Sequence, residues 1–280
     1  MKNIKTDDVY KMDQFFTKKE VAQSCLNVLK DIFDFNNFDC IIEPSAGEGS
    51  FFFLLPQDKR VGIELDGYLC LQYIEYDNKS FFDFEVKDDK NILTVGNPPF
   101  GTQNSLSVDF FNHAAKFSNV IAFIIPKTWN KKSIQNRLNE NFHLIKSVDL
   151  EPDCFYGEKQ TNVKCCFQVW QKAKNKRVKE KKILIHKDWD FLPYIKGKDD
   201  LEPPKEADFA ILAYGSNPGQ VSDNLFRWRP KSVHFIRSNI DVIKLISRFE
   251  KLDYSIANNS ARQSSLCKED LVKLYVEQYG

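Results

Sequence analysis

The sequence lacks the features that mark membrane-spanning proteins and secreted, disulfide-rich proteins. No apolar run in its 280 residues is long enough to cross a bilayer, and residues 1–5 lack the apolar core of a signal peptide. The seven cysteines are scattered, odd in number and contain no C-x-x-C pair. This usage predicts free thiols in a reducing compartment, cytoplasmic or nuclear, and no metal site.

The chain also lacks a strong charge of either sign, since its formal net charge is +1. A nucleic-acid partner must therefore be met by a local basic face. The segment 172–182 has seven basic residues in eleven. It is either a solvated linker or a strip that faces phosphates, and its place directly after a predicted strand suggests a position beside a substrate cleft.

Apolar runs and helical spacings alternate through the first part of the chain. Strands are expected at 40–42, 60–64, 91–96, 120–125, 144–149 and 163–170, and helices at 18–33 and 108–115. Thr17 is the expected N-cap of the first helix, with Glu20 completing a capping box. The alternation predicts an α/β, Rossmann-like doubly wound sheet as a first domain, residues 1–173.

A small C-terminal α/β domain, residues 178–280, is expected to follow. Its predicted strands are 183–185 and 209–214, and its predicted helices are 241–252 and 268–279. Arg227, Trp228 and Arg229 mix charge with an aromatic ring, which suits either nucleic acid or surface packing. Any sequence preference is expected here and in the loop 215–220.

A chemically specific motif, Asn97-Pro98-Pro99-Phe100, ends the predicted strand 91–96. The Asn97 side-chain oxygen and the Pro98 carbonyl can each accept one N–H of a planar amine. Phe100 offers a face on which the ring that bears the amine can stack. Asn, Pro and Gly are also common turn residues, so an ordinary turn is the alternative interpretation.

A glycine-containing loop, 43–49, follows the first predicted strand. In a doubly wound sheet, ligands bind outside the carboxyl ends of the strands, where this loop lies. Its spacing is not G-x-G-x-x-G and no Walker lysine follows, so neither NAD nor ATP is expected. Glu64 and Asp66 follow the second strand, where a carboxylate can accept ribose hydroxyls, and Asp83 follows the third. Glu43 could instead serve only to bind backbone amides.

Together these segments resemble the γ-class of S-adenosylmethionine-dependent adenine-N6 methyltransferases, over residues 14–170. The matching segments, in the family's order, are Gln14-Phe15-Phe16-Thr17, Glu43-Pro44-Ser45-Ala46-Gly47-Glu48-Gly49-Ser50-Phe51, Glu64-Leu65-Asp66, Asp83-Phe84 and Asn97-Pro98-Pro99-Phe100. The resemblance implies S-adenosyl-L-methionine as cofactor, bound by Phe16, Thr17, Glu43, Pro44, Ser45, Gly47, Gly49, Glu64, Asp66, Asp83 and Phe84. It also implies that Asn97, Pro98 and Phe100 are catalytic.

The resemblance further implies a target adenine held between aromatic residues. Phe155, or Tyr156 in its place, is expected on the face opposite Phe100. Pro99 is expected at the target, and Trp129 either lines the target pocket or packs in the core.

The polymer that carries the adenine is less constrained by the sequence. DNA is favoured over RNA, although the segment 97–104 is similar to that of ribosomal-RNA adenine methyltransferases. Lys18 replaces the proline that the family often has after Thr17. A protein glutamine-N5 methyltransferase and a catalytically silent nucleic-acid-binding subunit are the alternatives. The first usually lacks the Phe-Thr segment, and the second is disfavoured because Asn97 and the glycine loop are intact.

Overall fold

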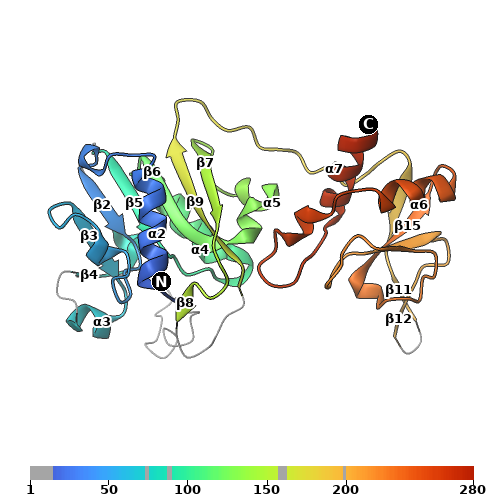
Figure 1. Cartoon of the computed structure of the whole chain (residues 1–280), viewed down its shortest axis with the longest axis horizontal. Coiled ribbons are helices and arrows are strands. Elements are labelled where there is room, and N and C mark those ends of the chain that lie inside the picture. Colours follow the sequence, from blue (N-terminus) through green and yellow to red (C-terminus); the bar gives the residue numbers. More distant parts are fainter. Residues whose placement is uncertain (1–14, 73–75, 87–89, 157–162, 198–199) are drawn as a thin grey trace. The chain divides into compact units, whose positions relative to one another are not determined.

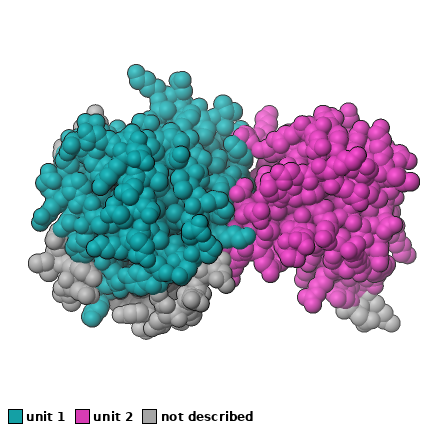
Figure 2. Space-filling view, viewed as in Figure 1, with its two compact units in different colours: residues 1–179 teal, residues 180–280 magenta. Residues whose placement is uncertain are grey.

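The structure is a computed structural model that describes residues 15–72, 76–86, 90–156, 163–197 and 200–280. Contacts between residues divide the chain into two compact units, unit 1 up to Lys179 and unit 2 from Glu180 onward (Figure 2). Each unit encloses buried apolar clusters of its own. Gln14, the first residue of the expected Phe-Thr segment, lies outside the described residues.

Unit 1 is built on a seven-stranded sheet in the order β4-β3-β2-β5-β6-β9-β7 (Figure 1). Its strands are β2 (Cys40–Glu43), β3 (Arg60–Glu64), β4 (Tyr76–Asn78), β5 (Ile92–Gly96), β6 (Val120–Pro126), β7 (Phe142–Asp149) and β9 (Cys165–Lys172). Strands β4, β3, β2, β5 and β6 run parallel, whereas β9 is antiparallel to β6 and to β7. The mostly parallel sheet confirms the expected Rossmann-like α/β fold.

Both faces of this sheet are buried. Successive side chains of a strand point to opposite faces, so Ile41 belongs to the cluster of helix α2 (Lys19–Lys30) and Ile42 to the cluster of helix α4 (Ser105–Ala114). All seven residues of β6 are buried. Burial on both faces explains why these strands appear in the sequence as unbroken apolar runs.

Short elements complete unit 1. They are α3 (Gly67–Gln72), α5 (Lys132–Gln135), β1 (Phe16–Thr17), β8 (Phe155–Tyr156) and the 3-10 turns η1 (Phe35–Asn37), η2 (Phe52–Leu54), η3 (Phe81–Asp83), η4 (Thr102–Asn104) and η5 (Lys127–Asn130). The β1–β8 ribbon, in which β1 pairs antiparallel with β8, joins segments far apart in the sequence.

The expected capping box at the start of the first helix is wrong. Lys18 is the N-cap residue of α2 and makes no side-chain cap hydrogen bond. Thr17 instead ends β1, where it is paired with Phe155. The helix signal in the sequence was correct, but a strand occupies the place of the predicted cap.

Unit 2 holds a four-stranded antiparallel sheet in the order β10-β15-β13-β14. Its strands are β10 (Trp189–Leu192), β13 (Phe209–Leu212), β14 (Val221–Ser222) and β15 (Val233–Ser238), with a separate hairpin of β11 (Ile195–Lys196) and β12 (Leu201–Glu202). Helices α6 (Val242–Glu250) and α7 (Lys268–Tyr279) share one core cluster with β10, β13 and β15. The 3-10 turns η6 (Pro230–Ser232) and η7 (Ser255–Asn258) lie between these elements.

One expected strand of this unit is wrong. Residues 183–185 are an exposed segment without strand pairing. An apolar run of three residues is too short to distinguish a strand from a connection between units.

Within the part of the chain that the structure describes, no helix is long and apolar enough to cross a membrane. The same residues contain no cluster of three or more histidine, cysteine or carboxylate side chains that could hold a metal ion. All seven cysteines are free thiols.

Candidate functional site

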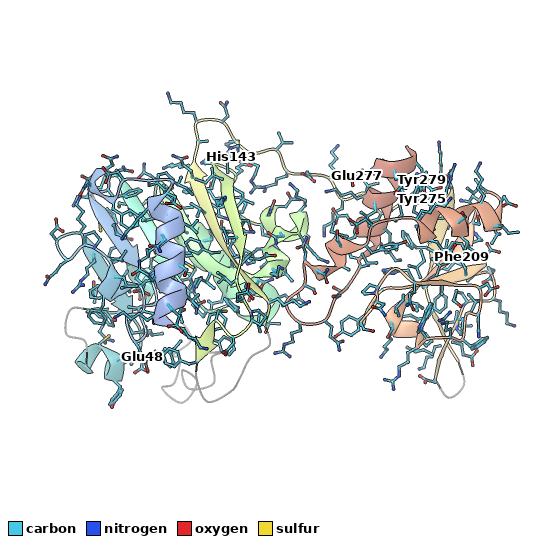
Figure 3. The ribbon with its side chains drawn as sticks, in the orientation of Figure 1. Glu48, His143, Phe209, Tyr275, Glu277 and Tyr279 are labelled. Carbon is cyan, nitrogen blue, oxygen red and sulfur yellow. The ribbon has the colours of Figure 1, made fainter. Side chains whose placement is uncertain are left out.

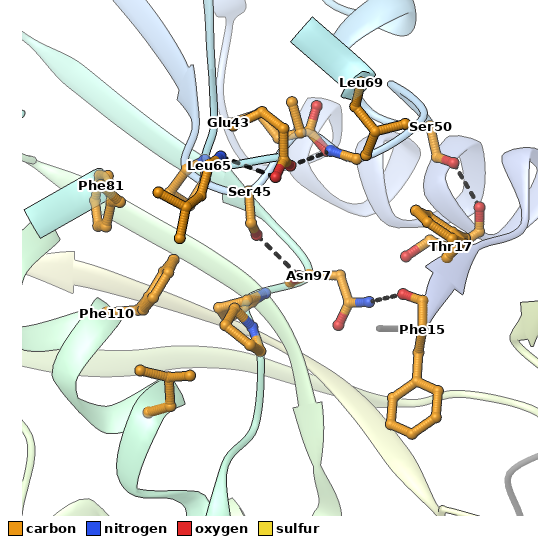
Figure 4. Close-up of a pocket in the computed structure, with 18 of the residues that line it drawn as sticks. Phe15, Thr17, Glu43, Ser45, Ser50, Leu65, Leu69, Phe81, Asn97 and Phe110 are labelled. Atoms are coloured by element: carbon orange, nitrogen blue, oxygen red, sulfur yellow. Dashed lines mark hydrogen bonds between the residues drawn. The ribbon is translucent and has the colours of Figure 1, made fainter. Parts of the chain in front are cut away.

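A cavity in unit 1 opens at the carboxyl ends of β2, β3 and β5 (Figure 4). The loops that follow these strands supply most of its wall, and the segments of β1, α3 and α4 and the segment after β4 supply the rest. The lining residues are Phe15, Phe16, Thr17, Glu43, Pro44, Ser45, Ala46, Gly47, Glu48, Ser50, Glu64, Leu65, Leu69, Lys79, Ser80, Phe81, Phe82, Asn97, Pro98, Pro99, Phe100, Leu106 and Phe110.

The Asn97 amide has a fixed orientation at this cavity. Its Nδ2 donates to the Phe15 carbonyl at 2.9 Å, and the Ser45 hydroxyl donates to the Asn97 carbonyl at 3.1 Å (Figure 4). The Asn97 Oδ1 atom is buried and has no hydrogen-bond partner among the described residues. A buried acceptor without a partner costs about 1–3 kcal/mol, so this oxygen is suited to an external N–H or O–H.

Glu43 is the most deeply buried carboxyl of the cavity wall. Burial raises its pKa well above the usual range, although the N–H groups of Phe52 and Phe51 oppose the shift and nearby Glu64 adds to it. Its Oε2 atom is buried without a hydrogen-bond partner among the described residues. The cavity wall therefore carries a second polar group with unused hydrogen-bonding capacity.

The loop after β2 is held by the β1–β8 ribbon. The Ser50 hydroxyl donates to the Thr17 carbonyl at 2.5 Å, and the Tyr156 hydroxyl donates to the Glu48 carboxylate. Gly47 has a φ of +52°, and a Cβ added there would lie 3.3 Å from the Phe16 ring. The left-handed conformation and this close approach explain the glycine.

Glu64 connects two of the cavity loops. Its Oε2 accepts the Gly47 N–H at 2.8 Å, and its Oε1 accepts the N–H groups of Leu65 and Asp66 at 2.9 Å each. A carboxylate has about four acceptor positions. Three are used by the backbone, so about one remains for a ligand hydroxyl.

The cavity has an apolar half and a polar half. Phe81, Phe110 and Leu65 lie on one side of the cavity, whereas Thr17 and Asn97 lie on the other (Figure 4). Such a division fits a ligand with an aromatic ring at one end and charged or hydrogen-bonding groups at the other.

Phe100 lies in a group of three rings instead of facing an open slot. Its ring centroid is 6.2 Å from that of Phe15 and 6.2 Å from that of Phe155, and Phe15 and Phe155 are stacked at 5.7 Å. Phe100 and Phe155 are inclined at 64° to each other. Phe155 is therefore one of the three packed rings, and it does not line the cavity.

The structure brings most of the predicted site residues to this one cavity. Those that line it are Phe16, Thr17, Glu43, Pro44, Ser45, Gly47, Glu64, Asn97, Pro98, Pro99 and Phe100. They come from four separate segments, so their meeting is a property of the fold.

Other predicted cofactor residues lie outside the cavity lining. Gly49, with a φ of +79°, closes a turn in which its N–H donates to the Ala46 carbonyl. Asp66 accepts the Tyr68 N–H at 2.9 Å at the start of α3. Asp83 is exposed on η3, and Phe84 packs edge-on against Phe117.

Two predicted target residues are also placed elsewhere. Trp129 is 0% exposed and packs against Phe111 at 5.8 Å, so it belongs to the core beneath α4. Tyr156 is exposed and donates to Glu48 in the loop after β2. Neither side chain lines the cavity.

The basic segment 172–182 does not begin beside the cavity, contrary to the expectation from the sequence. Strand β9 is antiparallel to β6, so Lys172 lies at the amino end of the parallel strands, opposite the cavity. In Figure 3, His143 lies at that end of the strands and Glu48 lies at the opposite end, where the cavity is. Arg177 donates to the carbonyls of Phe142 and Gln135, a structural role.

Sequence reasoning missed the apolar wall of the cavity. The apolar residues that it did not assign to a site include Leu65, Leu69, Phe81, Phe82, Leu106 and Phe110. Two polar lining residues, Lys79 and Ser80, were also not assigned. The available signal was the Phe81-Phe82 pair directly before Asp83, but the assignment went to the carboxylate, one residue beyond that pair.

Comparisons with known proteins give no assignment by sequence. No family model matches the chain, and no curated protein matches it.

Solved structures show a distant likeness to part of this chain. A protein of Pyrococcus horikoshii provisionally named an RNA methyltransferase has 16% identity and a TM-score of 0.48, over 58% of this chain and 89% of that one. The 23S rRNA methyltransferase ErmE has 15% identity and a TM-score of 0.42, over 59% and 72%. A Thermoplasma acidophilum protein has 12% identity and a TM-score of 0.43, over 59% and 93%. Likenesses of this size carry no assignment of activity, so the chemistry must be inferred from the side chains of the cavity.

Proposed function

We propose that the protein transfers a methyl group from S-adenosyl-L-methionine to the N6 amine of adenine in nucleic acid, with DNA favoured over RNA. The observation that carries the proposal is the fixed Asn97 amide. Its nitrogen is bound to the Phe15 carbonyl, and its buried oxygen has no partner among the described residues. An acceptor in this state, next to Pro98 and the Phe100 ring, suits an amino group on a planar ring.

The cavity residues fit the cofactor. Phe81, Phe82 and Phe110 supply an apolar wall for its adenine, and the remaining acceptor position of Glu64 can take a ribose hydroxyl. Thr17, Glu43 and Glu48 are polar lining residues, which suit the amino-acid end. The bound cofactor supplies an activated sulfonium methyl group.

The task of the protein is then to present the amine. Asn97 Oδ1 and the Pro98 carbonyl accept its two N–H groups, which withdraws the nitrogen lone pair from the ring and raises its nucleophilicity. Correct placement of two reactants is worth up to about 7–11 kcal/mol. The Phe15 carbonyl fixes the Asn97 side-chain amide, and the Ser45 hydroxyl binds the Asn97 backbone carbonyl. Both contacts contribute to this placement.

A base in a duplex must leave the stack to reach this cavity, at a cost of a few kcal/mol. The Phe100 ring is suited to stack on the flipped base. Because Phe15 and Phe155 pack around Phe100, we expect the Phe15 ring to shift when the base binds.

The direct test is transfer of a tritiated methyl group to DNA, RNA and protein in parallel, with N6-methyladenine identified in the digested product. Labelled N6-methyladenine from DNA is the expected result. Label in RNA would change the polymer, and label in glutamine would replace the proposal. Calorimetric titration that detected binding of neither the cofactor nor its demethylated product would exclude it.

A further inference from the structure

The segment 224–232 of unit 2 forms a rigid loop on one face of the sheet. The Arg227 N–H donates to the Asn224 carbonyl at 3.1 Å, and the Phe226 N–H donates to the Asn224 Oδ1 at 3.1 Å. Leu225 and Trp228 pack against the cluster on the outer face of β13 and β15. The loop is therefore anchored on both sides of Phe226.

Phe226 itself is turned away from this cluster and is 78% exposed. Its two neighbours in the turn, Leu225 and Arg227, fix its direction through one packing contact and one hydrogen bond. Exposure alone is not distinctive, because Ile243 on α6 is also 78% exposed. What differs is the surroundings of the two side chains.

Three cationic residues closely follow Phe226 in the sequence. Arg227, Arg229 and Lys231 are exposed, and none of the three has an ion-pair partner among the residues that the structure describes. Arg237 on the neighbouring strand is different, since Asp190 pairs with it at 2.9 Å. Between residues 209 and 240 the only acidic residue is Asp223.

A second exposed aromatic residue borders the loop. The backbone N–H of Tyr214 donates to the Ser232 carbonyl at 3.2 Å, and its side chain is half exposed. Tyr214 also forms a β-bridge with Ser265, in a segment that carries the exposed Arg262. Two aromatic side chains and several cations without acidic partners thus belong to adjoining segments.

We propose that this face of unit 2 binds single-stranded or locally unpaired nucleic acid, with Phe226 stacking on an unpaired base and Arg227, Arg229 and Lys231 contacting the adjacent phosphates. The inference rests on the proposed function and names the part of the chain that holds the polymer. Aromatic faces combined with unpaired cations are the usual means of binding such strands. A peptide partner would instead be expected to need acidic side chains to match the cations.

The test compares full-length variants by fluorescence anisotropy on a labelled single strand, a duplex with one unpaired adenine and a fully paired duplex. Phe226→Ala should weaken binding to the first two about tenfold and leave the third within about twofold. Ile243→Ala, which removes an equally exposed apolar side chain, is the matched control and should leave all three unchanged. The double variant Arg227→Gln/Arg229→Gln should lower the salt slope by about 0.7 per lost contact on the single strand.

The matched charge control is Lys174→Gln/Lys179→Gln in the basic segment, and its salt slope should equal that of the parent. Parent-like binding by Phe226→Ala would overturn this inference, whereas N6-methylation by the parent would leave the proposed function standing. A parent that neither binds nor methylates nucleic acid would overturn both. A labelled acidic peptide that bound the parent, and lost affinity in Phe226→Ala, would replace nucleic acid with a protein partner.

Discussion

Two buried groups that line the cavity of unit 1 and one buried carboxylate of unit 2 differ in how they are hydrogen-bonded. In unit 1, Asn97 Oδ1 and Glu43 Oε2 are buried without partners among the described residues, and both residues line one cavity. In unit 2, the Asp188 carboxylate accepts from the Tyr275 hydroxyl at 2.8 Å and from Arg248 at 3.3 Å. Buried groups that satisfy one another hold a fold together, whereas two unpartnered buried groups that line the same cavity indicate where a ligand binds.

The two units also differ in where the groups that carry the two proposals lie. Asn97 Oδ1 and Glu43 Oε2 of unit 1 are inside a cavity, whereas the cations of unit 2 without ion-pair partners among the described residues are exposed, on the segment that carries Phe226. Under the two proposals, unit 1 carries out the methyl transfer and unit 2 binds the nucleic acid. Each prediction below alters one side of this comparison.

The largest effect is expected from Asn97→Ala. The variant should lose at least about a hundredfold in methyl transfer, because it removes an acceptor for the target amine. Cofactor affinity, measured by calorimetry, should stay close to that of the parent. Asn91→Ala is the matched control, since Asn91 lies at the opposite end of the same segment and donates to the Asn37 carbonyl. Activity within threefold of the parent in Asn97→Ala would contradict the mechanism.

In unit 2 the corresponding change is Asp188→Ala. It leaves Arg248 and the Tyr275 hydroxyl without their shared acceptor, and we expect a loss of about 2–3 kcal/mol in the free energy of unfolding. Urea unfolding followed by Trp fluorescence measures it.

Asp190→Ala is the control for Asp188, because the Asp190–Arg237 pair is exposed and should contribute little to the free energy of unfolding. Cofactor affinity should not change in either variant. Equal losses in the two variants would show that the buried cluster is no special source of stability.

Phe100→Ala should weaken nucleic-acid binding by about 1–3 kcal/mol, the usual value of one stacked base. Cofactor affinity should change much less. Phe33→Ala removes a partly buried ring of the same core cluster away from the cavity, and so reports the effect of packing alone. If both variants lose nucleic-acid affinity equally, Phe100 acts through the fold and not through the base.

The last prediction concerns pH, and its effect at any single pH unit is small. Burial raises the pKa of Glu43, so the folded state holds a proton that the unfolded state has released. Stability should therefore fall as pH rises from the ordinary pKa of 4.5 toward the folded value, by up to about 1.4 kcal/mol per pH unit.

Glu43→Gln should remove this fall, which chemical unfolding at several pH values would detect. Glu151→Gln, which removes an exposed carboxylate of the same unit, is the charge control. A parent whose stability does not decline over this pH range would show that Glu43 is ionised in the folded protein.

Much of unit 1 could be predicted because its strands are buried on both faces. The run Val120–Ile125 appears as a continuous apolar segment, and the strand found there ends one residue later, at Pro126. The rule that ligands bind at the carboxyl ends of such strands then brought Glu43, Glu64 and Asn97 to one cavity.

The errors have a common physical origin, since they depend on strand direction and on very short elements. The reversed direction of β9 carries Lys172 to the edge opposite the cavity, and no local pattern reports that reversal. Strands β1 and β8 have two residues each, too few for a periodic signal. Trp129 follows the carboxyl end of β6, yet its ring packs in the core beneath α4.

The order of strands in the sheet also has a consequence for synthesis of the chain. Strand β6 emerges from the ribosome well before β9, although β9 covers its outer edge in the finished sheet. Until β9 has been made, the fully apolar β6 presents an unpaired edge. Until Phe155 has been made, Thr17 has no strand partner. Unpaired apolar edges are templates for association with other chains. Fragments that end between Pro126 and Cys165 should therefore aggregate instead of folding into a smaller cofactor-binding protein.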